Sequence, residues 1–387
     1  MKTAYRVLLG ALLAALLFFL FGLPPLLDDL ANGSTGAPTP PPDARAVALH
    51  GSLWVADMHA DSLMWNRSLE ERNERGHVDV PRLIEGGVAL QGFTIVSKAP
   101  WGMNVERNSG SSDLTAVLFV AERWPPRTWG SLLERALYQA ERLHAAARGS
   151  GGKLRVIRSR SELTRYIDDR AKNPAQTAGY LGIEGAQVLE GKLENVQRVF
   201  DAGFRMMAPS HFFDTEVGGS AHGEEKYGLQ PFGRQVIREM ERLGMLVDLA
   251  HASPQTIDDV LAIATKPAFF PHTGVLGTCD SPRNISDSAL DRTAAGGGLI
   301  GIGFFESATC GTDLAAVVQA IRYTVDRIGA EHVALGSDFD GFVATPIDSS
   351  QMASLTEALL GAGFSEEQIR SIMGRNVQRV LGRVLPP

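Results

Sequence analysis

Eight short apolar segments recur along this chain, and six of them lead within a few residues to a histidine or a carboxylate. The six pairings are residues 53–58 with His59 and Asp61, 180–183 with Glu184, 204–208 with His211, 245–250 with His251, 268–271 with His272, and 333–336 with Asp338. Residues 88–96 and 298–304 complete the eight. Several segments are apolar at successive positions, which is typical of strands buried on both faces.

Helical segments separate the predicted strands. Residues 131–147 carry an apolar stripe at helical spacing, and residues 233–243 and 313–328 are similar. Strand and helix alternating eight times predict an α/β fold, the (β/α)8 or TIM barrel. In such a barrel the C-terminal ends of all strands open on one face, which carries the active site. The six polar strand ends are therefore expected to meet.

The length of the chain fits one such domain. A barrel usually takes about 250 residues, and more with insertions, so residues 47–387 are predicted to form a single barrel with long loops. The charge is mildly acidic, with 37 Lys+Arg against 44 Asp+Glu, and no dense basic tract occurs. That composition argues against a nucleic-acid partner.

The first 46 residues differ from the rest. Lys2 and Arg6 precede an uncharged, mostly apolar stretch from Val7 to Leu27, which is long enough to span a bilayer. We interpret residues 1–27 as a single-pass anchor in the cytoplasmic membrane, with its basic end inside and the barrel on the extracytoplasmic (periplasmic) side. A cleaved signal segment, giving a secreted or periplasmic protein, is the alternative. Residues 28–46, rich in Pro and Gly, are predicted to form a linker.

Two cysteines occur, Cys279 and Cys310, which are too few for a disulfide framework. They follow the sixth and seventh predicted strands and therefore lie in neighbouring loops. An extracytoplasmic compartment would permit one bridge between them. We nevertheless expect two free thiols, at least one of them buried.

The polar strand ends have the chemistry of a metal centre. His59 and Asp61 lie two residues apart, and in a strand such residues point to the same side. His251 and His272 add imidazoles, and Glu184 adds a carboxylate that can bridge two cations. Nitrogen and oxygen ligands without thiolate suit zinc, and also manganese or cobalt. Two metals about 3.5–4 Å apart could hold a hydroxide between them and polarise a carbonyl.

Each of these residues also has a purely structural explanation. Asp61 could cap a helix, Glu184 could stabilise a helix start, and His251 precedes Ser253-Pro254, a helix N-terminus with Ser253 as the cap. Such explanations would have to hold at six strand ends at once, so the sequence favours a metal centre. The remaining histidines do not follow predicted strands and are interpreted as surface or structural residues: His50, His77, His144, His222 and His332.

These residues stand in segments that resemble the membrane (renal-type) dipeptidases, two-zinc metallopeptidases built on an amidohydrolase-like barrel. The resemblance covers nearly all of residues 56–381. Its motifs, in order, are DMHAD at 57–61, HVDVPRL at 77–83, GIEG at 182–185, VDLAHAS at 247–253, PHT at 271–273, SPRN at 281–284, GSDFDG at 336–341 and GRNVQRV at 374–380. The resemblance implies a barrel of the metal-dependent hydrolase type that holds two Zn²⁺ ions and hydrolyses the peptide bond of free dipeptides.

The same resemblance implies a role for each site residue. The metal ligands would be His59 and Asp61 on the first ion, His251 and His272 on the second, and Glu184 between both. Glu184, His211 and Asp338 would be the catalytic residues. Of the substrate-binding residues, His211 would polarise the substrate carbonyl, Arg283 would hold the C-terminal carboxylate, and Asp338 would handle protons at the attacking water.

Some features leave the substrate open. The loop 212–223 and Pro282 depart from the family's pattern, and the insertion 101–127, with Trp101, Trp124 and Trp129 in or just after it, is a candidate wall of the pocket. One alternative keeps the barrel but acts on a cyclic amide, a lactone or a β-lactam. Another, a non-catalytic binding protein, is disfavoured because no ligand is missing. The expected partners are a dipeptide and, through the N-terminal segment, a membrane; a homodimer stays open.

Overall fold

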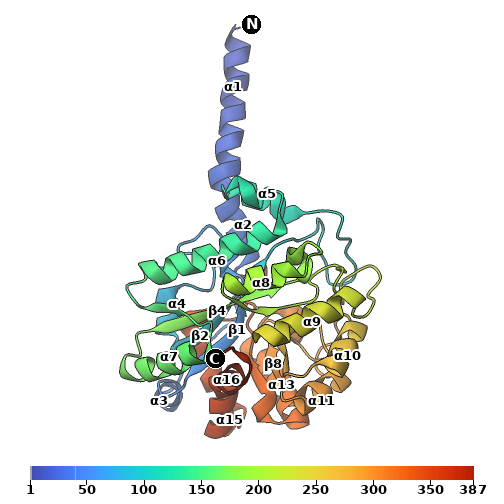
Figure 1. Cartoon of the computed structure of the whole chain (residues 1–387). Coiled ribbons are helices and arrows are strands. Elements are labelled where there is room, and N and C mark those ends of the chain that lie inside the picture. Colours follow the sequence, from blue (N-terminus) through green and yellow to red (C-terminus); the bar gives the residue numbers. More distant parts are fainter. Residues whose placement is uncertain (1, 40) are drawn as a thin grey trace.

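Eight parallel strands close into a barrel in the computed structural model, which describes residues 2–39 and 41–387 (Figure 1). The barrel strands are β1 (Val55–Ala60), β2 (Val88–Val96), β4 (Thr177–Glu184), β5 (Phe204–Met207), β6 (Leu246–Asp248), β7 (Ala268–Thr273), β8 (Leu299–Ile302) and β9 (Val333–Leu335). Pairing of β1 with β9 and of β2 with β4 completes the ring. The predicted fold class and all eight predicted strands are confirmed.

A further strand, β3 (Leu154–Val156), was not predicted. It pairs with residues 177–179 at the start of β4, whereas β5 pairs with residues 181–183. The strand has only three residues, two of them half-buried. It therefore lacks the continuous apolar run that marks the barrel strands.

Helices surround the barrel (Figure 1). They are α4 (Val80–Glu85), α5 (Leu114–Ala121), α6 (Leu132–Gly149), α7 (Arg160–Lys172), α8 (Glu194–Asp201), α9 (Pro231–Leu243), α10 (Pro254–Ile263), α11 (Asp287–Ala295), α12 (Glu306–Thr309), α13 (Leu314–Ile328), α14 (Met352–Gly361), α15 (Glu366–Arg370) and α16 (Asn376–Val384). The predicted helices correspond to α6, α9 and α13. Ser131, Asp313 and Ser253 begin α6, α13 and α10 as caps whose side chains accept a backbone N–H three residues on.

The end of the barrel opposite the polar strand ends is closed by the C-terminal part of the chain. There α16 packs its buried apolar residues against β1, β8 and β9. A Cβ atom on Gly374 would lie 1.8 Å from the carbonyl oxygen of Trp54, so only glycine allows this close approach. The site described below therefore lies at the other end.

The N-terminal residues form one long helix made of α1 (Lys2–Leu17), the π-helical turn η1 (Phe18–Gly22) and α2 (Leu23–Ala31). Its α1 part stands away from the barrel (Figure 1) and buries none of its residues. By length and composition this helix could cross a membrane, with a mean hydropathy of 2.6 in its most apolar window. A signal sequence near an N-terminus would pass the same test.

The predicted linker 28–46 is partly held by the barrel. Residues 28–31 still belong to α2, and α3 (Ala44–His50) begins within the segment. Between them, the Thr35 amide donates to the Thr345 carbonyl at 3.0 Å, and the Thr345 amide donates to the Gly33 carbonyl at 3.2 Å. The backbone of this segment therefore pairs with the loop after β9, a contact that its composition did not indicate.

Candidate metal centre

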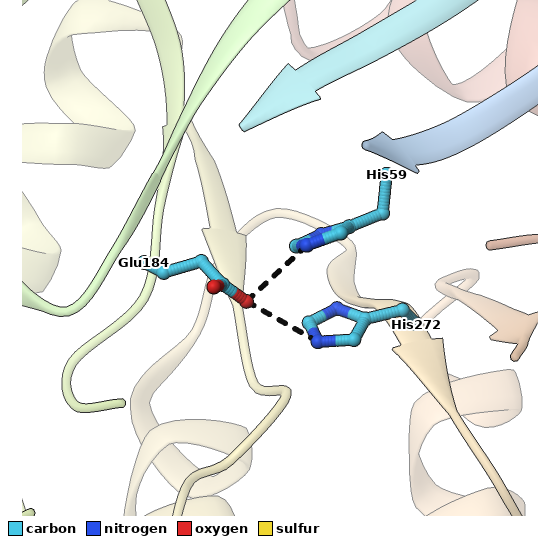
Figure 2. A group of neighbouring side chains, drawn as sticks. All are labelled: His59, Glu184 and His272. Carbon is cyan, nitrogen blue, oxygen red and sulfur yellow. Dashed lines mark ion pairs between the residues drawn. The ribbon is translucent and has the colours of Figure 1, made fainter. Parts of the chain in front are cut away.

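The predicted ligands converge at the C-terminal end of the barrel, with Glu184 at their centre. Its Oε1 atom lies 3.3 Å from His59 Nε2 and 3.2 Å from His272 Nε2 (Figure 2). The same oxygen is 3.5 Å from His251 Nε2, and Oε2 is 3.1 Å from His211 Nε2. All five side chains are buried. Four strand ends and their loops thus aim four imidazoles at one carboxylate.

A second group shares His59 with the first. His59 Nε2 lies 3.5 Å from Asp61 Oδ2 and 3.5 Å from Asp338 Oδ1. The hydroxyl of Thr94, on β2, donates to Asp61 Oδ1 at 2.7 Å and holds that carboxylate in place. Three sets of side chains have ligand atoms within 4.8 Å of one another, a spacing in which one ion could contact several of them: His59, Asp61 and Asp338; His59, Glu184 and His272; and Glu184, His211 and His251.

Two site residues are held in the left-handed backbone region. His251 has φ 61° and Asp338 has φ 63°, a conformation that non-glycine residues adopt rarely. The Ala221 amide donates to the His251 carbonyl at 2.7 Å, and the Gly341 amide donates to the Asp338 carbonyl at 3.1 Å. These bonds sustain the turns that direct both side chains into the barrel mouth.

The carboxylates make the cluster strongly attractive to a cation. Burial raises the pKa of Glu184 well above its usual range, and the neighbouring Asp61 carboxylate adds to this effect. Burial lowers the pKa of His59, but Glu184 and Asp61 outweigh it and raise that pKa to about 10. Without a metal, this negatively charged site therefore favours the protonated forms of Glu184 and His59.

The other three imidazoles have the opposite tendency. Burial lowers the pKa of His211, His251 and His272 well below 6.5, so these rings are neutral at neutral pH, the form that binds metals. His251 Nε2 and His272 Nε2 face each other at 2.9 Å. Within the described chain, both ring nitrogens of His59 and Oε1 of Glu184 are buried without a hydrogen-bond partner. Such converging, unpartnered donor atoms fit a metal centre.

A cavity of about 190 Å³ opens beside these residues. Its wall includes Met103, Asn104, Phe212, Arg283 and Phe342. This volume is below the roughly 300–1,000 Å³ that is usual for sites of drug-sized ligands. The cavity therefore suits a small ligand.

Arg283 is the only guanidinium in the wall of this cavity, among the residues described. Its Nη2 donates to the His272 carbonyl at 2.7 Å, and its guanidinium lies 5.6 Å from the centre of the Phe305 ring. Among the described residues, no carboxylate oxygen lies within 4.0 Å of an Arg283 nitrogen, so Arg283 forms no ion pair there. Asp338 lies on the same wall, and burial with Asp61 outweighs His59 and Arg283 to raise its pKa to about 7. The cavity thus places a buried guanidinium on the same wall as a carboxyl group that can exchange protons near neutral pH.

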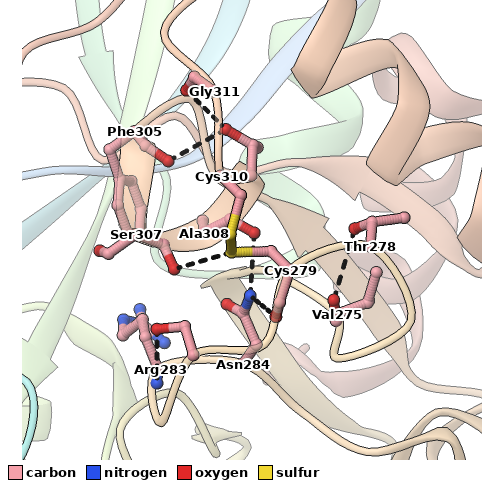
Figure 3. Close-up of a disulfide and its surroundings, with 12 residues drawn as sticks. Val275, Thr278, Cys279, Arg283, Asn284, Phe305, Ser307, Ala308, Cys310 and Gly311 are labelled. Atoms are coloured by element: carbon pink, nitrogen blue, oxygen red, sulfur yellow. Dashed lines mark hydrogen bonds between the residues drawn. A yellow bond between two sulfur atoms is a disulfide. The ribbon is translucent and has the colours of Figure 1, made fainter.

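The expectation of two free thiols is wrong. Cys279 and Cys310 form a disulfide with a Cα–Cα distance of 5.3 Å (Figure 3). The Asn284 side-chain amide reinforces it by donating to the Cys279 carbonyl at 2.8 Å and to the Ala308 carbonyl at 3.0 Å. The bridge joins the loop that carries Arg283 to the segment that carries Phe305. Sequence spacing could not decide this, because the bond depends on how two loops approach each other.

Sequence reasoning missed other residues around the cavity. His222, interpreted as surface or structural, is buried, and its ring centre lies 5.1 Å from that of His251. From the insertion 101–127 the cavity wall takes Met103, Asn104 and Val105, whereas Trp124 is buried and stacks on Phe119. Hydrophobicity therefore pointed to the right segment but to the wrong residues in it.

Comparison with known proteins agrees with this geometry. The family model described as membrane dipeptidase (peptidase family M19) matches residues 43–385. Dipeptidase tcpJ of Claviceps purpurea is 31% identical over 80% of this chain and 69% of its own length. Dipeptidase verJ of Clonostachys rogersoniana is 31% identical over 88% of this chain and 87% of its own. A Rhodobacter sphaeroides metallopeptidase, solved with a phosphinate mimic of the dipeptide L-Ala-D-Ala, superposes with a TM-score of 0.69 at 24% identity, over 86% of this chain and 99% of its own.

Proposed function

This chain belongs to the membrane dipeptidase family and is a metal-dependent dipeptidase, and from that premise we propose that it works with two zinc ions. In this proposal His59 and Asp61 would hold one ion, His251 and His272 would hold the other, and Glu184 would be shared by both. The supporting observation is the position of Glu184, whose Oε1 lies 3.2–3.5 Å from one imidazole of the first pair and both of the second. Imidazole and carboxylate donors without thiolate favour zinc in a catalytic role.

When bound, the ions would supply an acidic water and would polarise the scissile carbonyl. The protein residues do the rest. Asp338, with a pKa near neutrality, takes a proton from the attacking water and returns it to the nitrogen that leaves. His211, neutral because burial lowers its pKa, donates a hydrogen bond to the substrate oxygen as negative charge develops on it.

Arg283 selects the substrate. A free dipeptide carries a carboxylate next to its scissile bond, and a guanidinium binds that group through two parallel hydrogen bonds. Arg283 is buried, stacks on Phe305 and has no protein carboxylate as an ion-pair partner in the described residues. The guanidinium is thus available to a ligand. A longer peptide would move its carboxylate away from this position.

The test compares kcat/KM for one dipeptide and its C-terminal amide. The wild type should strongly prefer the free dipeptide, and Arg283→Ala should lose about 2–4 kcal/mol of transition-state stabilisation for the free form alone. Arg292→Ala, which removes an exposed arginine of α11, is the matched control. Equal cleavage of both substrates by the wild type would show that Arg283 does not recognise the C-terminal carboxylate. Because the Rhodobacter sphaeroides enzyme was solved with a mimic of L-Ala-D-Ala, the panel includes L,L- and L,D-dipeptides.

We also propose that residues 1–27 stay attached as a membrane anchor, with the barrel outside the cytoplasm. Lys2 and Arg6 at the start of the apolar helix favour a cytoplasmic N-terminus. The Cys279–Cys310 disulfide supports an oxidising compartment for the barrel. N-terminal sequencing of the native protein tests this proposal, since a start near Ala31 would mean that the segment is cleaved.

A further inference from the structure

The apolar N-terminal helix is joined to the barrel by a buried ionic contact. Asp28, on α2, is buried, and its Oδ2 lies 2.7 Å from Nε of Arg67, which is also buried in the loop after β1. Arg67 Nη2 in turn lies 3.0 Å from Asp340 Oδ1 in the loop after β9. Buried charges keep each other in place because separation would leave each one unpaired in a dry environment. The contact therefore fixes the base of the helix on two catalytic-face loops.

A third loop contacts the helix about two turns before Asp28, at Leu20 and Phe21. Pro24 and Pro25 have no N–H, so the Leu20 carbonyl lacks a partner at the usual helical positions. The guanidinium of Arg123, just after α5, donates to that carbonyl and lies 4.5 Å from the centre of the Phe21 ring. The connection after β2 thus satisfies a group that the two prolines leave open. The loops after β1 and β2 therefore contact residues 20–28 directly, and the loop after β9 reaches Asp28 through Arg67.

The same loops form the wall of the catalytic cavity. Met103 follows β2 in that wall, and Gly341 and Phe342 follow β9. The Phe342 amide donates at 3.0 Å to the side chain of Asn32, the residue after α2. In Figure 1, α1 leaves the molecule beside α5, while α15 and α16 lie toward the opposite end. The helix therefore rises from the face of the barrel that carries the site.

Exposed apolar side chains gather on that face. Apart from the N-terminal helix, six large apolar residues are exposed in the described chain: Val47, Trp101, Val117, Trp129, Leu276 and Phe342. All except Val47 lie in connections that leave the C-terminal ends of strands. Trp101 is 58% exposed and Trp129 is 47% exposed. Tryptophan is enriched where a membrane meets water.

The length of the apolar helix agrees with a membrane surface close to the catalytic face. An α-helix rises about 1.5 Å per residue, so the apolar residues from Val7 to Phe21 cover about 22 Å of the roughly 30 Å of a hydrocarbon core. The membrane surface then falls just beyond Phe21, where Arg123 contacts the helix. Building on the proposed anchor, we propose that this junction holds the catalytic mouth toward the bilayer, with Trp101 and Trp129 at the membrane–water interface.

The experiment places the full-length protein in liposomes whose lipids carry bromine near the headgroup end of the acyl chain, and measures quenching of tryptophan fluorescence. Quenching should fall about two-fold in Trp101→Phe and Trp129→Phe. It should not fall in Trp54→Phe, the matched control at the closed end of the barrel. Unchanged quenching in the two test variants would overturn the orientation.

Two further measurements separate this inference from the anchor itself. If the wild type fails to float with the liposomes, the anchor proposal fails; if it floats but Trp101 and Trp129 are not quenched, only the orientation fails. A Gly/Ser insertion of about ten residues between Gly22 and Leu23 should keep flotation and dipeptide hydrolysis in detergent but reduce the quenching of both tryptophans. Undiminished quenching in that variant would overturn the rigid junction.

Discussion

Arg67 Nη2 lies 3.0 Å from Asp340 Oδ1, and both side chains are buried. Asp340 also accepts hydrogen bonds from the Ser62 hydroxyl at 2.5 Å and from the His77 amide at 2.6 Å. Burial raises the pKa of Asp340, but Arg67, His77 and the hydrogen bonds from Ser62 and His77 together outweigh it and lower that pKa, which keeps this carboxylate ionised. Because Asp340 is two residues from Asp338, this pair supports the loop that carries the carboxylate we propose for proton transfer.

Replacing Arg67 with methionine should destabilise the protein by about 3–5 kcal/mol, since Asp28 and Asp340 would be left buried without a counter-charge. The measurement is the thermal midpoint together with kcat/KM for a dipeptide, and both should fall. Arg72→Met is the control, because its pair with Glu85 is exposed and such pairs contribute little. Equal midpoints for the two variants would refute a supporting role of Arg67.

Glu184→Gln should remove at least one zinc ion per chain and abolish dipeptide hydrolysis while the barrel stays folded. The physical reason is that an amide cannot bridge two cations with two anionic oxygens. Elemental analysis of purified protein and far-UV circular dichroism measure the two effects, with Glu194→Gln on the exposed side of α8 as the control. Full metal content in Glu184→Gln would show that this carboxylate is not the bridge.

Replacing both Cys279 and Cys310 with serine should raise KM for dipeptides several-fold and leave the metal content unchanged. The disulfide holds the loop of Arg283 against the segment of Phe305, so its loss should free the proposed carboxylate receptor but not the proposed metal ligands. A loss of about 2–4 kcal/mol in stability should accompany this effect. The result would contradict this interpretation if KM stayed constant or if the metal were lost instead.

Glu122, which lies outside the metal centre, should make the stability of the protein depend on pH. Burial outweighs Arg142 and raises the pKa of Glu122 to about 7 from its usual 4.5. Between these two values the folded state binds more protons than the unfolded state, so the free energy of unfolding falls as pH rises. The loss in the free energy of unfolding is complete above pH about 7, where Glu122 is ionised in both states.

Glu122→Gln removes this titration. Relative to the wild type, the variant should gain about 2–3 kcal/mol of stability between pH about 4.5 and about 8. Urea unfolding of both proteins across this interval gives the slope of the free energy of unfolding against pH. The difference between the two slopes does not depend on the hydrogen bond from Trp124, which the glutamine alters. Parallel pH profiles would show that the pKa of Glu122 is not raised in the folded protein.

The sequence by itself determined the barrel and the list of residues at its mouth. Apolar runs and helical stripes are local patterns, and each predicted metal ligand follows its own strand closely, so the position of Glu184 or His272 needs no knowledge of distant segments. The parallel barrel then brings these ends together, whatever the loops do. For the same reason the eight barrel strands were predicted, while β3, with only three residues, was not.

Only the tertiary structure decided the contacts between segments that are remote in sequence. Ser34 forms a β-bridge with Thr345, Asp28 forms an ion pair with Arg67, and Cys279 forms a disulfide with Cys310. No sequence periodicity links the two positions of any of these pairs. The segment 28–46 reads as a linker by composition, yet its backbone pairs with the loop after β9. Such contacts depend on the shape of loops, and that shape follows from the packing of the whole chain and not from local propensity.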